Sequence, residues 1–215
     1  MIELGDIVRI NKLLSNLGIC SRKEAARYIE DGRVKVNGIL SIPGQWVEES
    51  DEILIDDEPV SAREKIYIAL NKPVGITCTA EKTVKGNIIE YMNYPEYIFP
   101  VGRLDKPSQG LIILTNDGVL ANKILESENE HEKEYIVTLD REFDEEFIKG
   151  MSSGVEICGQ ITRPCKVFRV DNNTFRIILT QGLNKQIRRM SKVFGYNVIR
   201  LERVRIMNIT LDGIE

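Results

Sequence analysis

Short apolar runs limit this 215-residue chain to a few fold classes. The run at residues 111–114 is far shorter than the roughly 20 apolar residues that a membrane-spanning helix needs. From residue 66 onward, strand-like runs outnumber helical patterns, and the two kinds do not alternate regularly. A doubly wound parallel sheet does not fit this order, so we predict an α+β domain with a mixed, largely antiparallel sheet. We expect strands at residues 66–70, 111–115, 134–139, 166–170, 174–180 and 197–201, and helices near 119–125, 144–151 and 183–194.

The first 60 residues predict a separate small domain with two helices and short strands. Apolar residues recur at helical spacing over residues 10–17. Ser21-Arg22-Lys23-Glu24 is a capping-box pattern, which predicts that a second helix begins at about Arg22. Asn37-Gly38 predicts a tight hairpin turn. A polar stretch at residues 61–65 then separates a domain at residues 1–60 from a second domain at residues 66–215.

Charge is distributed unevenly along the chain. The 29 basic and 33 acidic residues give a net charge of −4, which excludes a wholly basic nucleic-acid coat. Counted from the sequence, residues 9–40 carry seven basic and three acidic residues, whereas residues 41–60 carry seven acidic and no basic residues. Residues 176–205 carry eight basic residues and one acidic residue. This local excess predicts an anion-binding surface, with nucleic acid favoured over a protein partner. For the amino-terminal helices, a solvated helix pair is the alternative.

The amino terminus, the cysteines and the single histidine exclude further classes of protein. The amino terminus lacks a basic segment leading into a long apolar core, so it does not predict a secretory signal. None of the four cysteines has C-x-x-C spacing, a pattern that favours buried thiols in a reducing compartment. The single histidine, His131, excludes a histidine-rich zinc site. We therefore expect a cytoplasmic location and no membrane association.

Three segments contain candidate functional residues. Asp105 lies in a loop rich in turn formers directly before an apolar strand, although turn chemistry is the alternative explanation. Tyr135 begins a predicted strand, where it is either a core residue or a platform for a flat ligand. Arg188 and Arg189 flank the apolar face of the helix expected at residues 183–194, so at least one can lie half-buried at the sheet end. Residues 71–75 are interpreted as turn scaffolding.

Four motifs follow one another along the chain. They are Lys72-Pro73-Val74-Gly75, Gly102-Arg103-Leu104-Asp105, Lys133-Glu134-Tyr135 and Gln186-Ile187-Arg188-Arg189-Met190. Their order and spacing resemble those of RNA pseudouridine synthases. The closest resemblance is to the branch that modifies ribosomal RNA and carries an amino-terminal RNA-binding module of the kind first described in ribosomal small-subunit protein four. Residues 129–135 and 203–208 further resemble the large-subunit rRNA synthase F subgroup.

The resemblance implies a fold, an activity and a set of site residues. It implies the pseudouridine synthase fold and isomerisation of a uridine of 23S rRNA, without cofactor or metal. Asp105 matches the family's catalytic nucleophile, Arg188 the arginine that pairs with it, and Tyr135 the tyrosine that stacks on the target base. The implied RNA-binding residues are Arg103, Arg22, Lys23, Arg27, Lys185 and Arg189.

Other functions stay open at this point. The same fold could serve as a non-catalytic RNA-binding factor in ribosome assembly, which would not need Asp105, Tyr135 and Arg188 together. The isomerase could act on a small-subunit rRNA or a tRNA stem-loop instead. A hydrolase with a carboxylate nucleophile would release free uracil. We expect ribosomal RNA as the partner, with tRNA as the alternative, and a monomeric protein.

Overall fold

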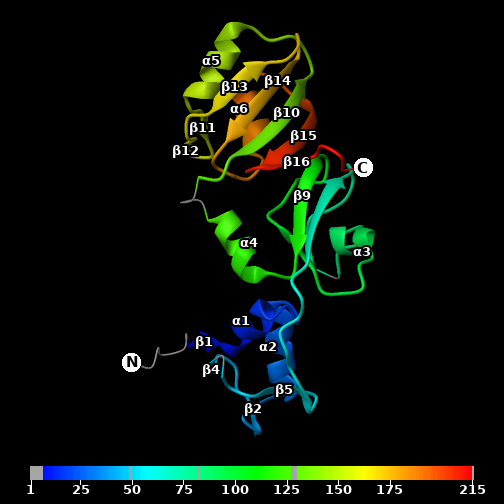
Figure 1. Ribbon diagram of the computed structural model, residues 1–215. Coiled ribbons are helices and arrows are strands. Elements are labelled where there is room, and N and C mark those ends of the chain that lie inside the picture. The colour runs from blue at the N-terminus through cyan, green and yellow to red at the C-terminus, as the bar shows by residue number, and fades with distance from the viewer. Residues whose placement is uncertain (1–6, 49, 82, 127–129, 215) are drawn as a thin grey trace. The chain divides into compact units, whose positions relative to one another are not determined.

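The computed structural model describes residues 7–48, 50–81, 83–126 and 130–214 (Figure 1). The chain forms two compact units. The first contains residues 7–67 within the described part, joined by Tyr94–Phe99 and Thr115–Ala121, and the rest of the described chain forms the second. The expected division into domains at residues 1–60 and 66–215 stays a prediction. None of the described helices is both long enough and apolar enough to cross a membrane.

The amino-terminal unit consists of a helix pair and short strands. Helix α1 (Ile10–Asn16) and helix α2 (Arg22–Glu30) bury Ile10, Leu14 and Ala25 in a common apolar core. The strands are β1 (Val8–Arg9), β2 (Val34–Val36), β3 (Ile39–Leu40), β4 (Trp46–Val47), β5 (Ile53–Ile55) and β6 (Glu58–Pro59). β1 pairs with β4, and the other four form an antiparallel sheet in the order β3-β2-β5-β6.

Local signals position α2 and the hairpin that follows. The Ser21 Oγ accepts a hydrogen bond from the Glu24 backbone N–H at 3.1 Å, which confirms the predicted helix start. Asn37 and Gly38 both have positive φ, as the predicted hairpin turn between β2 and β3 requires. On α2, Ala25 and Ile29 are buried. Arg22, Lys23 and Arg27 are exposed.

The second unit is built on one mixed sheet with the strand order β13-β14-β10-β15-β9-β7. Its strands are β7 (Tyr67–Lys72), β8 (Phe99–Val101), β9 (Gln109–Thr115), β10 (Lys133–Leu139), β13 (Lys166–Arg169), β14 (Thr174–Leu179), β15 (Val198–Ile206) and β16 (Ile209–Thr210). β10 is antiparallel to β14 and β15, and β13 is antiparallel to β14, whereas β15 and β9 are parallel. The predicted α+β class with a largely antiparallel sheet is confirmed.

Helices and a small hairpin complete the secondary structure. The helices are α3 (Ile88–Met92), α4 (Gly118–Leu125), α5 (Glu145–Ser153) and α6 (Gln186–Val193). The hairpin pairs β11 (Glu156–Ile157) with β12 (Gln160–Ile161). Helix α6 begins three residues later than the predicted 183–194, because Lys185 has a φ of 50° and cannot continue a right-handed helix. Strand β15 extends past the predicted end at residue 201 to Ile206.

Helices α5 and α6 contribute to the core on one face of this sheet (Figure 1). Alternate residues of the central strands, such as Val137 and Leu139 of β10, are buried in that core with Phe147 of α5 and Met190 of α6. Tyr135 packs against the same core and, by the two-residue period of the strand, shares the face of Val137. The residue pattern of β10 therefore directs Tyr135 toward the side of the sheet where α6 lies.

Because of a β-bulge in β15, the side chains of Arg203 and Arg205 point to different sides of the sheet. Tyr135 is opposite Arg203, but the adjacent Glu134 is opposite Arg205, so β15 has one extra residue at this point. Residues two apart on a regular strand share a face. The bulge lets Arg203 lie on the side of Tyr135 while Arg205 forms a salt bridge with Glu134.

The parallel pairing of β15 and β9 depends on Gly110. Gly110 is opposite Arg203 and has a φ of 106°. A Cβ at this position would lie 2.3 Å from the Arg203 carbonyl oxygen and 2.6 Å from its backbone nitrogen. Only glycine fits here without moving a strand.

Replacing this glycine tests that requirement. Gly110→Ala should lower the free energy of unfolding by at least about 3 kcal/mol, because the added methyl group overlaps the β15 backbone. Gly159→Ala is the matched control, since Gly159 also has a positive φ, of 77°, but nothing lies within 4 Å of its would-be Cβ. It should cost only about 1–2 kcal/mol. Urea unfolding measures both, and equal losses would contradict the packing argument.

Candidate active site

A cavity of about 760 Å³ in the second unit brings together most of the residues that the sequence singled out. Its lining includes Arg103, Asp105, Tyr135, Lys185 and Arg188. These side chains come from the loop before β9, from β10, and from the first residues of α6 and the turn before it. Segments far apart in sequence therefore converge on Asp105.

Arg188 holds the loop that carries Asp105. Its guanidinium donates to the Pro107 carbonyl at 3.2 Å, to the Ser108 Oγ at 3.3 Å and to the Val198 carbonyl at 2.8 Å. Ser108 is only 1% exposed. A planar guanidinium can reach three such acceptors at once, which a single ammonium group does less well.

Arg203 holds the same loop from its two ends. It is 3% exposed and donates to the Leu111 carbonyl at 2.7 Å and to the Arg103 carbonyl at 3.4 Å. Its Nη2 is buried and has no hydrogen-bond partner within the described part of the chain. Segment 103–111 is thus fixed by arginine side chains that bind its backbone.

The expected direct ion pair between Asp105 and Arg188 is not formed. Within the described chain, neither a hydrogen bond nor a salt bridge reaches the half-buried Asp105 carboxylate. Arg188 instead binds the loop beside it. The two charges still interact through space: burial lowers the pKa of the Arg188 guanidinium, and the attraction of Asp105 opposes that shift.

Lys72 at the end of β7 is a second buried cation near Asp105. Its side chain is fully buried, and its Nζ donates to the Pro73 carbonyl at 2.8 Å and to the Ile76 carbonyl at 3.0 Å. Burial lowers the pKa of this ammonium, while Cys78 and Asp105 act in the opposite direction. The sequence-based interpretation of residues 71–75 as turn scaffolding therefore describes the turn but misses its buried charge.

Tyr135 and Lys133 form the β10 side of the cavity. Tyr135 is partly buried against the core and lines the cavity. An aromatic ring at a cavity wall is suited to stacking on a flat ligand. The pKa of Lys133 is lowered by burial and by the charge of Arg203. The cavity therefore combines one aromatic ring, the Asp105 carboxylate and several cations.

Arg189 lies outside this cavity. Its guanidinium donates to Asn184 Oδ1 at 2.9 Å and to the sulfur of Cys158. It lines a smaller recess of about 300 Å³ together with Lys192 and Asn197. The helical pattern did not decide which of Arg188 and Arg189 lies at the sheet end. The structure shows that Arg188 lines the cavity.

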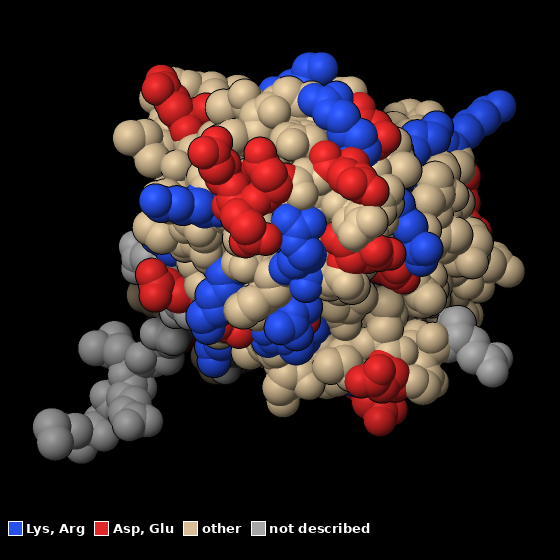
Figure 2. Space-filling view, turned by 90° about the horizontal axis from the view of Figure 1, so that it is seen from above, with Lys and Arg blue, Asp and Glu red and all other residues tan. Residues whose placement is uncertain are grey.

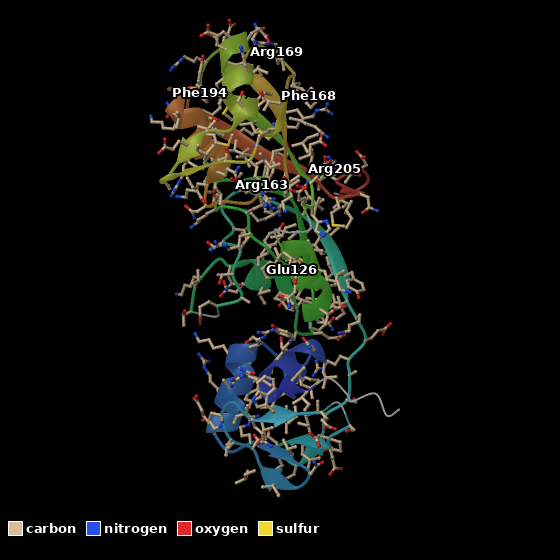
Figure 3. The ribbon with its side chains drawn as sticks, turned by 90° about the vertical axis from the view of Figure 1, so that its left-hand side faces the viewer. Glu126, Arg163, Phe168, Arg169, Phe194 and Arg205 are labelled. Carbon is tan, nitrogen blue, oxygen red and sulfur yellow. The ribbon has the colours of Figure 1, made fainter. Side chains whose placement is uncertain are left out.

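The basic segment 176–205 is partly neutralised. Arg205 pairs with Glu132 at 3.0 Å and with Glu134 at 2.7 Å, and Arg176 pairs with Glu134 at 3.4 Å. Figure 2 shows acidic and basic side chains interleaved on the face in view, and Figure 3 shows Arg205 at the base of the sheet, away from Arg169. Of the basic residues of this segment for which no salt bridge is found in the described chain, Lys185, Arg188 and Arg203 line the cavity, and Arg189 and Lys192 line the smaller recess.

Sequence reasoning overlooked Ser108 and Arg203 as well as the charge of Lys72. Two of them have a weak signal in the sequence: Lys72 is the last residue of a strand, and Arg203 occupies an inward position two residues after Leu201 on β15. The described residues contain no group of three His, Cys, Asp or Glu side chains that could hold a metal ion. Asn129, at the start of one motif of the resemblance, lies outside the described residues.

Comparison with known families identifies the class of protein. Residues 66–192 match the RNA pseudouridylate synthase family, and residues 8–53 match the S4 domain. The first match spans more than half of the chain, and this chain belongs to the RNA pseudouridine synthase family of isomerases, with an S4 RNA-binding domain preceding the synthase domain. The resemblance stated from the four motifs is confirmed.

Individual relatives agree with this assignment. The chain is 53% identical over 210 residues to the dual-specificity RNA pseudouridine synthase RluF of Escherichia coli (strain K12), covering 96% of this chain and 72% of the relative. It is 30% identical over 215 residues to the ribosomal large subunit pseudouridine synthase B of Bacillus subtilis (strain 168), covering 96% and 88%. A crystal structure of a pseudouridylate synthase superimposes with a TM-score of 0.71 at 28% identity, covering 97% of this chain and 93% of that one.

The buried ammonium of Lys72 predicts a pH dependence of stability. Because its pKa is lowered in the native protein from the ordinary value of 10.5, the unfolded chain binds more protons over the interval between the two values. The stability of the wild-type protein relative to Lys72→Met should therefore rise as pH increases toward 10.5. Urea unfolding from neutral to alkaline pH measures this difference. For Lys149→Met, at an exposed lysine of α5, the difference in the free energy of unfolding from wild type should not change with pH. A difference between wild type and Lys72→Met that also does not change with pH would contradict the argument.

Proposed function

We propose that this protein isomerises a specific uridine of large-subunit ribosomal RNA to pseudouridine, with Asp105 as the catalytic nucleophile. The observation that carries the proposal is the cavity that Asp105 and Tyr135 line together, with the buried cations Lys72 and Arg188 close enough to interact with the carboxylate. The names of the relatives support an RNA substrate and, for the Bacillus subtilis protein, the large ribosomal subunit. Isomerisation needs no net change in composition. The N1–C1′ bond breaks, a C5–C1′ bond forms, N1 gains a proton and C5 loses one.

Each cavity residue has a part in this reaction. Asp105 acts on the uridine through its carboxylate, and Arg188 holds the loop that carries it. Tyr135 stacks on the uracil while the base is detached and turned. Arg103, which is exposed at the cavity, contacts the RNA where the target nucleotide leaves its stack. Extruding a base from a stem costs a few kcal/mol, which phosphate contacts offset.

Further RNA contacts come from exposed basic side chains. On α2 these are Arg22, Lys23 and Arg27, which are exposed on a helix that buries Ala25 and Ile29. In the second unit Lys185 lines the cavity, and Arg189 lies beside it on α6. Lysine and arginine contacts with phosphate supply affinity that falls with salt concentration.

The proposal extends to partner, assembly and location. Ribosomal RNA is the substrate that we favour, and a tRNA stem-loop is the alternative because one relative is a dual-specificity RNA enzyme. A monomer suffices, since all residues that line the cavity come from one unit of a single chain. A cytoplasmic location agrees with four free cysteines in the described chain.

Loss of the carboxylate tests the proposed function. Asp105→Ala should abolish tritium release from rRNA transcripts labelled at C5 of uridine, because the group that acts on the uridine is gone, while RNA binding and the melting temperature persist. Asp212→Ala, at an exposed aspartate, is the control and should behave as wild type. Binding without release from the wild-type protein would favour a non-catalytic ribosome-assembly factor. Free uracil as the product would favour a hydrolase.

Adjacent arginines on α6 provide a matched pair of variants. Arg188→Lys keeps the charge but cannot reach Pro107, Ser108 and Val198 together, so the single-turnover rate should fall about 100-fold. Arg189→Lys, outside the cavity, should change the rate by less than about 3-fold. Equal rates for the two variants would show that Arg188 does not contribute to the reaction.

A further inference from the structure

The acidic segment at residues 41–60 has no part in the function proposed above. It belongs to the amino-terminal unit, supplies strands β4, β5 and β6, and carries seven acidic and no basic residues. Negative charge repels the phosphate backbone, so this segment does not fit an RNA-binding surface. Its charge therefore needs another explanation.

The sheet β3-β2-β5-β6 has two different faces. Val34, Val36 and Ile53 lie on one face and are buried in a common core with residues of α1 and α2. The residues between them point to the opposite side, because side chains alternate along a strand. The helix pair thus covers one face of the sheet. The other face is called the outer face.

Strand register aligns an apolar row across the outer face. Leu40 is opposite Lys35, Lys35 is opposite Leu54, and Leu54 is opposite Pro59. Three of the four residues in this row are apolar. Leu40 is 56% exposed, Pro59 is exposed and Leu54 is half-buried. Apolar side chains that lie together in solvent are typical of a binding surface.

Ile42 extends this row beyond the end of β3. The backbone N–H of Ser41 donates to the Val34 carbonyl at 2.9 Å, so the pairing with β2 continues past Leu40. The Ser41 side chain is buried, on the side of the core. Ile42 therefore points to the same side as Leu40, and it is 66% exposed.

The basic residues beside the apolar row are neutralised. Lys35 forms a salt bridge with Asp57 at 2.5 Å, and Arg33 forms one with Asp56 at 2.5 Å. Both aspartates belong to the turn between β5 and β6. These two cations are therefore already paired with carboxylates of the same unit.

Further carboxylates beside the row are unpaired. Glu52 lies two residues before Leu54, so it points to the outer face at the end of β5. Glu58 lies on β6, at the edge of the sheet. Both glutamates are exposed, and neither forms a salt bridge within the described chain. The outer face thus combines exposed apolar side chains with net negative charge.

We propose that the outer face is a docking surface for a protein segment that is rich in lysine and arginine and carries interspersed apolar side chains. The apolar row supplies contact area, and the carboxylates attract and orient the basic partner. The exposed basic residues of α2 belong to the helix pair on the other face. One unit can thus hold RNA and a basic protein at the same time. The inference does not depend on the proposed function.

The test uses a short, labelled synthetic peptide of alternating lysine and leucine, with fluorescence anisotropy as the measurement. One control peptide has glutamate in place of lysine, and the other has serine in place of leucine. The wild-type protein should bind the lysine–leucine peptide saturably and at least about 10-fold more tightly than either control, because only that peptide offers both positive charge and apolar side chains.

A matched pair of double variants tests the apolar row. Leu40→Ser combined with Ile42→Ser should weaken binding of the lysine–leucine peptide at least about 10-fold, because two apolar contacts are lost. Val193→Ser combined with Ile199→Ser removes two aliphatic side chains of the second unit with similar exposure, 58% and 63%. That control should keep the dissociation constant within about 2-fold of wild type.

A second pair tests the negative charge. Glu52→Lys combined with Glu58→Lys should weaken binding of the peptide about 10-fold and remove most of its dependence on salt concentration. Glu146→Lys combined with Glu156→Lys makes the same change in net charge at exposed glutamates of the second unit. This control should keep the salt dependence of wild type. If the Leu40 and Ile42 double variant does not fold, this pair decides.

Several outcomes would overturn the proposal. Absence of saturable binding by the wild-type protein would do so, as would equal losses in the matched controls. An equal loss of affinity for an rRNA transcript in the Leu40 and Ile42 double variant would make the face an RNA surface. A wild-type dimer in sedimentation that this variant lacks would assign the face to a second copy of the chain.

Hydrogen exchange locates the bound peptide. The lysine–leucine peptide should slow backbone exchange within residues 33–59 and leave α2 unchanged, and protection of α2 instead would refute the assignment. Tritium release is not part of this test, so failure of the proposed function leaves its result unaffected.

Discussion

The site depends on hydrogen bonds from cationic side chains to the backbone of residues 103–111. Arg203 binds the carbonyls of Arg103 and Leu111, and Arg188 binds that of Pro107. These donors are themselves fixed: Arg203 by the close approach of β15 to Gly110, and Arg188 by its place on α6. Because the contacts are to the main chain, they fix the path of the loop directly. The direction of the Asp105 side chain follows from that path.

Much of the fold was predictable because its signals are local. The capping box at Ser21 and the Asn37-Gly38 turn act over a few residues, so the sequence alone specified them. The alternating pattern of β10 and the apolar stripe of α6 likewise follow from the period of each element. Two-residue strands such as β11 and β12 have too few residues for any period, and they were not predicted.

The site was predictable only in part, for a related reason. The motif resemblance pointed to Asp105, Tyr135 and Arg188, and the structure brings all three to one cavity. The contact of Arg188 with the loop backbone, in place of a direct ion pair, depends on tertiary geometry that no spacing encodes. The direction of Arg203 depends on a one-residue bulge in the pairing of β10 with β15. A pattern that assumes regular alternation cannot detect such a bulge.

The use of backbone acceptors around Asp105 has a consequence for sequence drift. Carbonyl oxygens are present whatever side chain a residue carries, so Lys106 can be exchanged without removing the acceptor that Gly75 binds, and Pro107 without removing the one that Arg188 binds. The side chains at these two positions can therefore change without loss of the hydrogen bonds that fix the loop. The side-chain donors Arg188 and Arg203 have no such freedom, because their hydrogens belong to the guanidinium groups themselves. One backbone frame around Asp105 can thus accommodate loops of different side-chain composition.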